Sequence, residues 1–226
     1  MKYFLSVLLI TFVFMTCEAK YKYNFNSQHD LEESWGFKGA NFLIPKTKFY
    51  IDNSSSAEDG KVIKLDSRRS TGVLATVLPI DVKKFPILRW RWRILATISL
   101  APNAKEPDDQ AGVVYIGDGS LLKQFSLAYR WEYNTKVNTK QLIKYTSGRS
   151  EVFAICVRNK ETKVGEWVIE EKNILDDYKL AFSRHPKGKV ILCLGANSQY
   201  TKSNTIVEID YIEFLPLSKS NNKNKK

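Results

Sequence analysis

Three arginines alternate with two tryptophans in one short segment, LRWRWRI, and this is the most informative stretch of the sequence. If the segment is a strand, its successive side chains point to opposite faces of a sheet. Trp90 and Trp92 then share a core face, and Arg89, Arg91 and Arg93 share the other. Neighbouring guanidinium groups on that second face are about 7 Å apart, so the face is strongly positive.

Two later segments repeat this division between apolar and charged positions. Arg130 alternates with aromatic residues in SLAYRW, and Glu208 and Asp210 alternate with apolar residues in IVEIDY. If these segments belong to the same sheet, they add one guanidinium and two carboxylates to its outer face. The six candidate ligand-binding residues are therefore Arg89, Arg91, Arg93, Arg130, Glu208 and Asp210.

Two interpretations fit this charged face. It can be a self-satisfied ladder of arginine–carboxylate pairs, which add only modest stability at a surface. It can also be a ligand platform, because arginine forks bind carboxylates, sulfates and vicinal hydroxyls with defined geometry. Tyr115, Tyr129 and Tyr133 then either stack on sugar rings beside the arginines or pack in the core.

Asp108 and Asp109 lie in the acidic run EPDD, just before a strand-like segment. Oxygen ligands on a loop at a sheet edge suit calcium, so a structural calcium ion is the cofactor to consider here. The spacing is not that of a dedicated calcium loop, and a solvated acidic turn is the alternative. The sequence indicates no other cofactor.

Cys156 and Cys193 lie in apolar, strand-like runs, FAICVR and VILCLG. They are either two buried thiols on neighbouring strands or a disulfide. The disulfide is possible if the protein is exported, because disulfides form under the oxidising conditions outside the cytoplasm. A nucleophilic role is disfavoured, because apolar burial raises the pKa of a thiol.

Catalytic motifs are absent from the sequence. It has two histidines, His29 and His185, and no Ser-His-Asp order, HExxH motif, phosphate loop or Cys-His zinc spacing. Paired carboxylates can cleave glycosides, and the candidate pairs are Glu170 with Glu171 and Glu208 with Asp210. Such acids are common on exposed strands, so enzymatic activity stays uncertain and the sequence favours a non-enzyme.

The elements that must position these residues are short strands separated by turn residues. Such spacing without alternating helices predicts an all-β, jelly-roll-like antiparallel β-sandwich. The expected strands are 41–51, 62–67, 72–78, 87–96, 112–116, 125–133, 141–145, 152–158, 166–172, 190–195 and 205–214.

One short helix is expected after Asn173, which can cap it. Leu175, Tyr178 and Phe182 fall on one face at helical spacing, and Pro186 ends any continuation.

The amino terminus has the three parts of a secretory signal peptide: a positive start, the apolar run YFLSVLLITFVFM, and the small residues Cys17 and Ala19. We expect cleavage after Ala19; acylation of Cys17 in a lipoprotein is the alternative. The run is short for a membrane span, which needs about 20 residues, and no other segment approaches that length. The prediction is an exported, periplasmic or extracellular protein, with a signal peptide at 1–19 and one sandwich domain at 20–217.

The formal net charge is +11, and residues 218–226 contribute four lysines and no acid. These residues are either a disordered, solvating tail or a segment attracted to an anionic partner such as lipid headgroups, cell-wall polymer or acidic polysaccharide. Nucleic acid is not an expected partner, because no nucleic-acid-binding motif is present. The sequence gives no indication of the oligomeric state.

Ordered segments over roughly 37–214 resemble family 3047 of the domains of unknown function. They are FPILRWRWRI, Asp108-Asp109 before the strand ending at Tyr115, SLAYRW, GEWVIEEKNILDDYKLAF and NTIVEIDYIEF. The resemblance implies a secreted or periplasmic bacterial protein and supplies no catalytic residue, since no activity is established for the family.

More distantly, the expected architecture resembles the galactose-binding-type jelly rolls of carbohydrate-binding modules. That resemblance implies a calcium ion at a sheet edge and a sugar on a concave sheet face, although fold does not fix function. The chain lacks an obvious row of exposed tryptophans, so its arginines favour an acidic ligand.

The function we expect is a non-catalytic binding module for a glycan or another polar, anionic ligand of the cell envelope. A glycosidase or lyase acting on polysaccharide is one alternative, and an envelope structural or interaction protein is the other.

Overall fold

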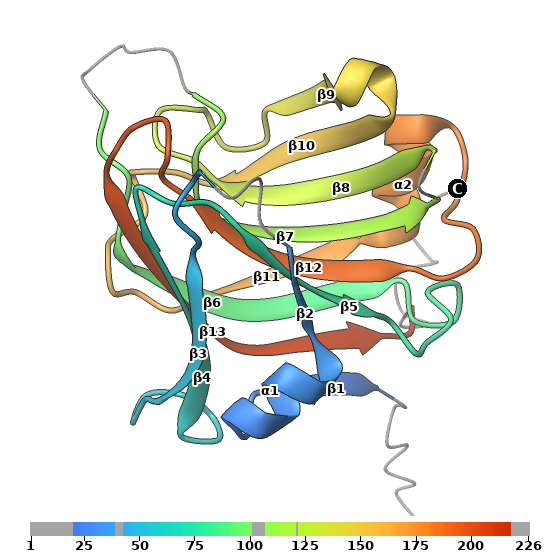
Figure 1. Cartoon of the computed structure of the whole chain (residues 1–226). Coiled ribbons are helices and arrows are strands. Elements are labelled where there is room, and N and C mark those ends of the chain that lie inside the picture. Colours follow the sequence, from blue (N-terminus) through green and yellow to red (C-terminus); the bar gives the residue numbers. More distant parts are fainter. Residues whose placement is uncertain (1–19, 39–42, 101–106, 121, 218–226) are drawn as a thin grey trace, which may run out of the picture.

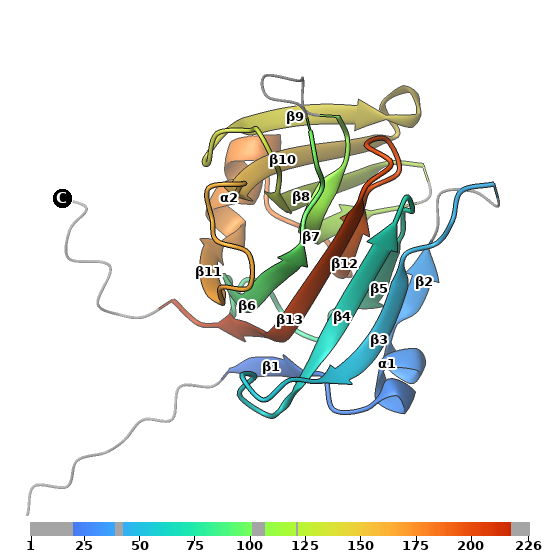
Figure 2. The ribbon, with the colours of Figure 1, turned by 90° about the vertical axis from the view of Figure 1, so that its left-hand side faces the viewer.

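The computed structural model describes residues 20–38, 43–100, 107–120 and 122–217. Two β-sheets pack face to face, with a helix at each of two margins (Figures 1 and 2). The predicted β-sandwich is thereby confirmed. The predicted signal peptide at 1–19 and the basic tail at 218–226 lie outside the described residues, so these two boundaries stay predictions.

The six-stranded sheet has the order β11-β6-β13-β4-β3, and β1 pairs with β13 beside β4. The last strand, β13, is therefore paired along both edges, with β6 on one side and with β4 and then β1 on the other. The strands of this sheet are β1 (Tyr21–Asn24), β3 (Lys48–Asn53), β4 (Lys61–Arg68), β6 (Ile87–Ala96), β11 (Val168–Asn173) and β13 (Asn204–Leu215).

The seven-stranded sheet has the order β2-β5-β12-β7-β8-β10-β9. Its pairs are antiparallel except β8 with β10, which run parallel because the chain passes through β9, at the sheet edge, between them. The strands are β2 (Gly36–Lys38), β5 (Val73–Val77), β7 (Gln110–Gly119), β8 (Gln124–Trp131), β9 (Lys140–Tyr145), β10 (Ser150–Arg158) and β12 (Ile191–Asn197).

The core lies between the sheets and is dominated by aromatic side chains. Trp90 and Trp92 on β6 are fully buried, as the alternating pattern predicts. Their rings lie 5.4 Å from Tyr129 and 5.3 Å from Trp131, both on β8 of the opposite sheet. Burial of a large apolar side chain contributes about 1.5–3 kcal/mol, so these contacts are a main source of adhesion between the sheets.

The predicted helix is α2 (Ile174–Phe182), and Asn173 caps it by accepting hydrogen bonds from the amides of Leu175 and Asp176. Tyr178 is buried, as expected from its place on the apolar face. The helix ends at Ser183, which adopts a left-handed conformation, rather than at Pro186. Tyr129 donates a hydrogen bond to Asp177, which ties the helix to the seven-stranded sheet.

A second helix, α1 (Gln28–Ser34), was not predicted; Ser27 caps it, and Leu31 is its buried residue. A single 3₁₀ turn, η1 (Thr146–Gly148), follows β9. Neither α-helix in the described part of the chain has the length and apolar composition of a membrane-spanning segment.

Candidate functional site

The three arginines of β6 lie on the outer face of the six-stranded sheet, as predicted, and each is bonded to a carboxylate. Arg89 lies 2.6 Å from Glu171 and 3.0 Å from Glu213. Arg91 pairs with Asp210, and Arg93 lies 2.7 Å from Glu208. The sequence therefore places Glu208 and Asp210 correctly beside the arginines.

Other groups cover this ladder of ion pairs. The Trp167 ring lies 4.5 Å from the Arg91 guanidinium and 4.4 Å from that of Arg93. The Ser54 hydroxyl and the Ser56 carbonyl accept further hydrogen bonds from these two arginines, which are each 19% exposed. Ligand binding by the ladder stays a prediction, and the contacts present are those of a self-satisfied network.

Arg130 does not join these residues, contrary to the expectation of a single charged face. It lies on β8, which pairs with β7 and β10 in the seven-stranded sheet. Alternation along a strand tells which residues share a face, but it does not tell to which sheet the strand belongs. Arg130 therefore points outward on the opposite side of the sandwich.

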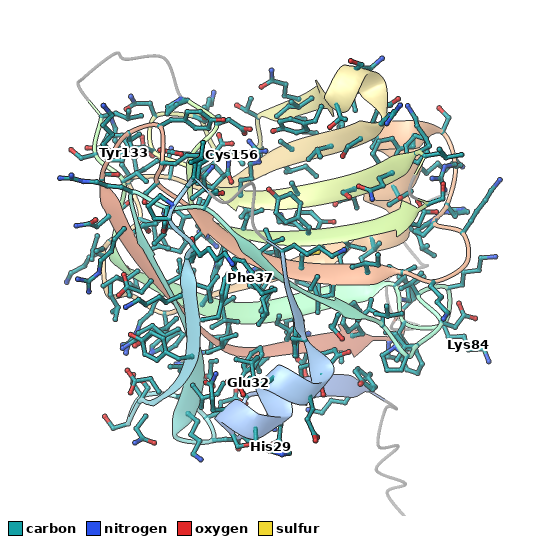
Figure 3. All side chains as sticks on the ribbon, viewed as in Figure 1. His29, Glu32, Phe37, Lys84, Tyr133 and Cys156 are labelled. Atoms are coloured by element: carbon teal, nitrogen blue, oxygen red, sulfur yellow. The ribbon has the colours of Figure 1, made fainter. Side chains whose placement is uncertain are left out.

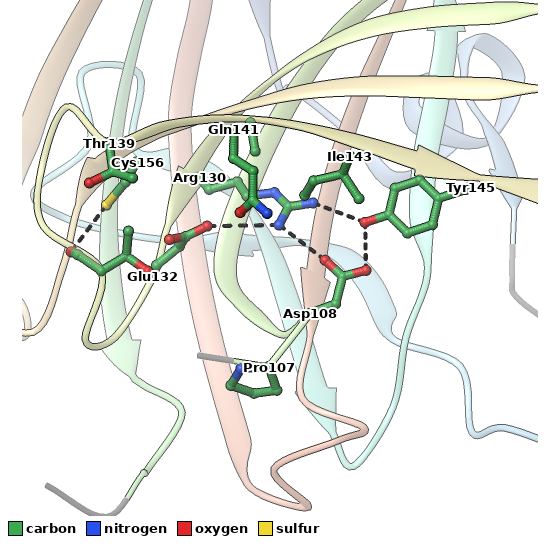
Figure 4. A pocket seen from close by; sticks show the side chains of 11 residues that line it. Pro107, Asp108, Arg130, Glu132, Thr139, Gln141, Ile143, Tyr145 and Cys156 are labelled. Atoms are coloured by element: carbon green, nitrogen blue, oxygen red, sulfur yellow. Dashed lines mark hydrogen bonds and ion pairs between the residues drawn. The ribbon is translucent and has the colours of Figure 1, made fainter. Parts of the chain in front are cut away.

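There Arg130 is the centre of a second polar cluster (Figure 4). One of its terminal nitrogens donates to Asp108 at 3.0 Å and lies 3.7 Å from Glu132. The other donates to the Tyr145 hydroxyl at 3.3 Å. Tyr145 in turn donates to the second oxygen of Asp108 at 2.6 Å, so the three side chains form a closed ring of hydrogen bonds.

The outer face of the seven-stranded sheet is hollowed around this cluster. A depression of about 340 Å³ contains Arg130, and one of about 210 Å³ adjoins it at Asp108 and Tyr145. A third, of about 270 Å³, adjoins the second at Val73 and Tyr115. We call these three connected depressions the sheet groove.

Small side chains on neighbouring strands form much of the groove floor. Ala154, Ser126, Gly117 and Gly195 line it on β10, β8, β7 and β12. A Cβ atom at Gly195 would lie 2.9 Å from a methyl group of Val73, so a larger residue there would have to displace that side chain. These small residues leave space where larger ones would fill the face.

Charge and burial fix the protonation of the groove centre. Burial lowers the pKa of Arg130, but Tyr115, Asp108 and Tyr145 outweigh it and hold that pKa above its ordinary value. Burial and the hydrogen bond to Asp108 raise the pKa of Tyr145. The arginine is therefore a permanent cation, and the tyrosine keeps its proton at neutral pH.

The two cysteines line the groove, but they do not form a disulfide. The two thiols are not bonded to each other, because β7 and β8 lie between β10 and β12. The disulfide alternative is therefore wrong, and so is the expectation of neighbouring strands. Burial raises the pKa of the Cys193 thiol to about 11, which disfavours a nucleophilic role.

Asp108 and Asp109 bind different partners. Asp108 faces Arg130 and Tyr145, whereas Asp109 accepts hydrogen bonds from the amides of Tyr200 and Thr201. Within the described ranges, no group of three or more histidine, cysteine or acidic side chains is arranged to hold a metal ion. Calcium binding at this pair stays a prediction.

The remaining candidates are dispersed. Tyr115 lines the groove, Tyr129 is in the core, and the Tyr133 ring packs against Lys160. Glu170 is buried and pairs with Arg158, away from the groove. His29 lies on α1, at the opposite end of the molecule from Cys156 (Figure 3).

Several groove residues escaped the sequence analysis, namely Glu132, Gln141 and Tyr145. The alternation of Gln141, Ile143 and Tyr145 along β9 was the available signal, because it places all three on one face. In the groove, both oxygens of Asp108 accept hydrogen bonds. The cluster thus presents charged and polar groups to the depression that contains it.

A family model described as "Protein of unknown function (DUF3047)" matches residues 35–213. No curated protein matches the chain.

Similar solved structures share the β-sandwich. The family 11 carbohydrate-binding module of Lic26A-Cel5E from Clostridium thermocellum is 11% identical, with 81% of this chain and 88% of that chain covered and a TM-score of 0.39. The carbohydrate esterase vb_24B_21 from Shiga toxin-encoding bacteriophage phi24B is 14% identical, with 87% and 97% covered and a TM-score of 0.46. Winged bean acidic lectin is 14% identical, with 88% and 98% covered and a TM-score of 0.43.

Proposed function

We propose that this chain, which belongs to the DUF3047 family of proteins of unknown function, is a non-catalytic module that binds a glycan-like ligand in the sheet groove. The observation that carries the proposal is the groove itself. Its lining residues come from every strand between β5 and β9, in three depressions joined by shared residues. The groove therefore crosses the sheet from β5 to β9, and at about 4.8 Å between neighbouring strands its length is about 24 Å, which suits an extended chain of sugars.

The lining chemistry supports a hydroxyl-rich ligand. Thr135, Thr139 and Gln141 offer hydroxyl and amide groups beside the buried Arg130 cluster. Tyr115 and Tyr145 add aromatic surface, which pairs polar recognition with ring contact. Ligand-binding sites are concave and carry a few precisely placed polar groups, and the sheet groove has both features.

The binding test uses a glycan array and the protein beginning at Lys20. Gln141 is exposed on β9 and lines the groove, so Gln141→Ala removes a polar contact without disturbing the core. Lys140→Ala is the matched control, because this neighbour on β9 points to the opposite face. We expect wild type and the control to bind the same glycans and Gln141→Ala to bind them more weakly. Absence of any glycan binding by wild type refutes the proposal.

The same experiment separates binding from catalysis. Bound oligosaccharides are recovered after incubation and analysed by mass spectrometry. A binding module returns them intact. Shortened or unsaturated products would replace the proposal with the alternative of a glycosidase or lyase.

Export through the signal peptide at 1–19, and hence a ligand in the cell envelope, is part of this proposal. Expression in a bacterial host followed by amino-terminal sequencing tests it. We expect mature protein outside the cytoplasm that begins at Lys20. Unprocessed protein retained in the cytoplasm contradicts it, and acylated Cys17 supports the lipoprotein alternative.

A further inference from the structure

We infer that the sheet groove recognises a carboxylate-bearing sugar, a uronate, at Arg130 and Tyr145, and that Asp108 occupies the carboxylate position until the ligand replaces it. This inference rests on the proposed function, because it names the ligand class of the same groove. It is carried by the geometry of the Arg130 cluster and by the different burial of its members.

The cluster already holds a carboxylate. Arg130 donates to one oxygen of Asp108 at 3.0 Å, and the Tyr145 hydroxyl donates to the other at 2.6 Å. Charge-assisted hydrogen bonds of this kind are about twice as strong as neutral ones. The carboxylate of a bound uronate can accept the same two bonds.

The guanidinium keeps unused capacity. Asp108 accepts from only one terminal nitrogen of Arg130, and the other terminal nitrogen makes a long hydrogen bond of 3.3 Å to the Tyr145 hydroxyl. An arginine fork pairs with a carboxylate most strongly through two parallel bonds. Asp108 is tied to the backbone and makes only one, whereas a free ligand carboxylate can turn to make both.

The burial of the partners indicates which one can leave. The Arg130 side chain is 5% exposed and lies in a strand of the sheet, so it is fixed. The Asp108 side chain is 37% exposed and comes from the segment before β7, at the groove rim. Its displacement breaks no strand pairing, whereas Glu132 is buried and stays beside the cation.

Because of the carboxylates beside Arg130, an anionic ligand can bind there only by replacing Asp108. With Asp108 in place, the Arg130 guanidinium already lies within 4 Å of two carboxylates, those of Asp108 and Glu132. A third carboxylate beside these two would be repelled. After Asp108 leaves, the ligand carboxylate restores the same balance. Removing the Asp108 charge should therefore increase the affinity for acidic sugars.

The test measures the binding of an array of oligouronates and of their neutral methyl esters. Wild type is compared with Asp108→Asn and Asp108→Ser, and Lys140→Ala is the control outside the groove. Thermal unfolding of each variant verifies folding. Two different replacements are made at this partly exposed position, so that one folded variant remains if the other does not fold. We expect both variants to bind oligouronates about 10-fold more tightly or better and the methyl esters without change.

Other outcomes overturn the inference in distinguishable ways. Equal or weaker oligouronate binding by both folded variants, while neutral glycans still bind the groove, refutes the role of Asp108 and leaves the proposed function intact. A parallel gain for acids and esters also refutes it, because steric relief would then be the cause. Absence of binding by every variant to every sugar rejects both proposals together.

Discussion

Asp118 at the end of β7 offers a direct test of the polar contacts that hold the sandwich to its second helix. Its side chain is 2% exposed and accepts hydrogen bonds from both terminal nitrogens of Arg184 at 2.7 Å. The Tyr178 hydroxyl on α2 and the amide of Lys187 also donate to it. Asp118→Asn keeps the shape of the side chain and removes its charge.

The expected loss follows from these contacts. Removal of one partner of a fully buried ion pair costs about 3–5 kcal/mol. Arg184 is 23% exposed and regains some hydration, so we expect the substitution to lower the free energy of unfolding by about 2–3 kcal/mol. At about 2–4 °C per kcal/mol for a chain of this length, Tm should fall by roughly 5–10 °C at pH 7.

The effect should depend on pH in one direction. Burial raises the pKa of Asp118, but Arg184, Tyr178 and the Lys187 amide outweigh it and hold that pKa below its usual range. A carboxyl with a lowered folded pKa stabilises the protein above its unfolded pKa, about 3.9, and loses this contribution as pH falls through the folded value. The difference between wild type and Asp118→Asn should thus be constant from about pH 5 to 7 and shrink below about pH 4.

Circular dichroism melts from pH 3 to 7 measure both effects, and Asp59→Asn, at an exposed aspartate, is the control. A Tm within about 1 °C of wild type at pH 7 would show that water replaces these contacts at no cost. A difference that grows on acidification would show that the sign of the argument is wrong.

Three further predictions concern the two sheet faces. Arg91→Ala should leave the buried Asp210 without its cation and lower the unfolding free energy in urea by about 2–3 kcal/mol, with glycan binding unchanged; lost binding at unchanged stability would favour the ligand-platform interpretation. Ala154→Leu should fill the groove floor and abolish glycan binding, with Tm lowered by roughly 2–10 °C because enlarging a buried residue costs about 1–3 kcal/mol; normal binding would place the site elsewhere. Thiol titration of the denatured protein beginning at Lys20, without reductant, should find both Cys156 and Cys193 reactive, whereas no reactive thiol would indicate a disulfide.

Local pattern predicted most of the fold. The strand bounds 87–96 agree with β6, because strict alternation of arginine with apolar residues is a strong period-two signal. The cap at Asn173 located α2. By contrast, β1, β2 and α1 were missed, since each is short and buries little of its own surface. The expected strand 112–116 ended before Asp118 and Gly119, yet both lie within β7.

The site could be predicted only in part. The sequence singled out Arg130 and Asp108 as functional candidates, and the structure brings them together. It assigned Arg130 to the wrong sheet, because the pairing of β8 with β7 and β10 depends on contacts distant in sequence. The pairing of β9 with β10 is local, since residues 146–149 join them, but Tyr145 reaches the cluster only because β10 pairs with the more distant β8.

The central position of β13 has a consequence for how the protein reaches its native state. Strands β1, β4 and β6 all pair with β13, the last strand that the structure describes. The six-stranded sheet is therefore incomplete until β13 has been synthesised. Contacts of such long sequence separation are slow to form, because the intervening loop must be closed first. The six-stranded sheet should therefore be completed late in folding, after pairs such as β3 with β4, which do not involve β13, have formed.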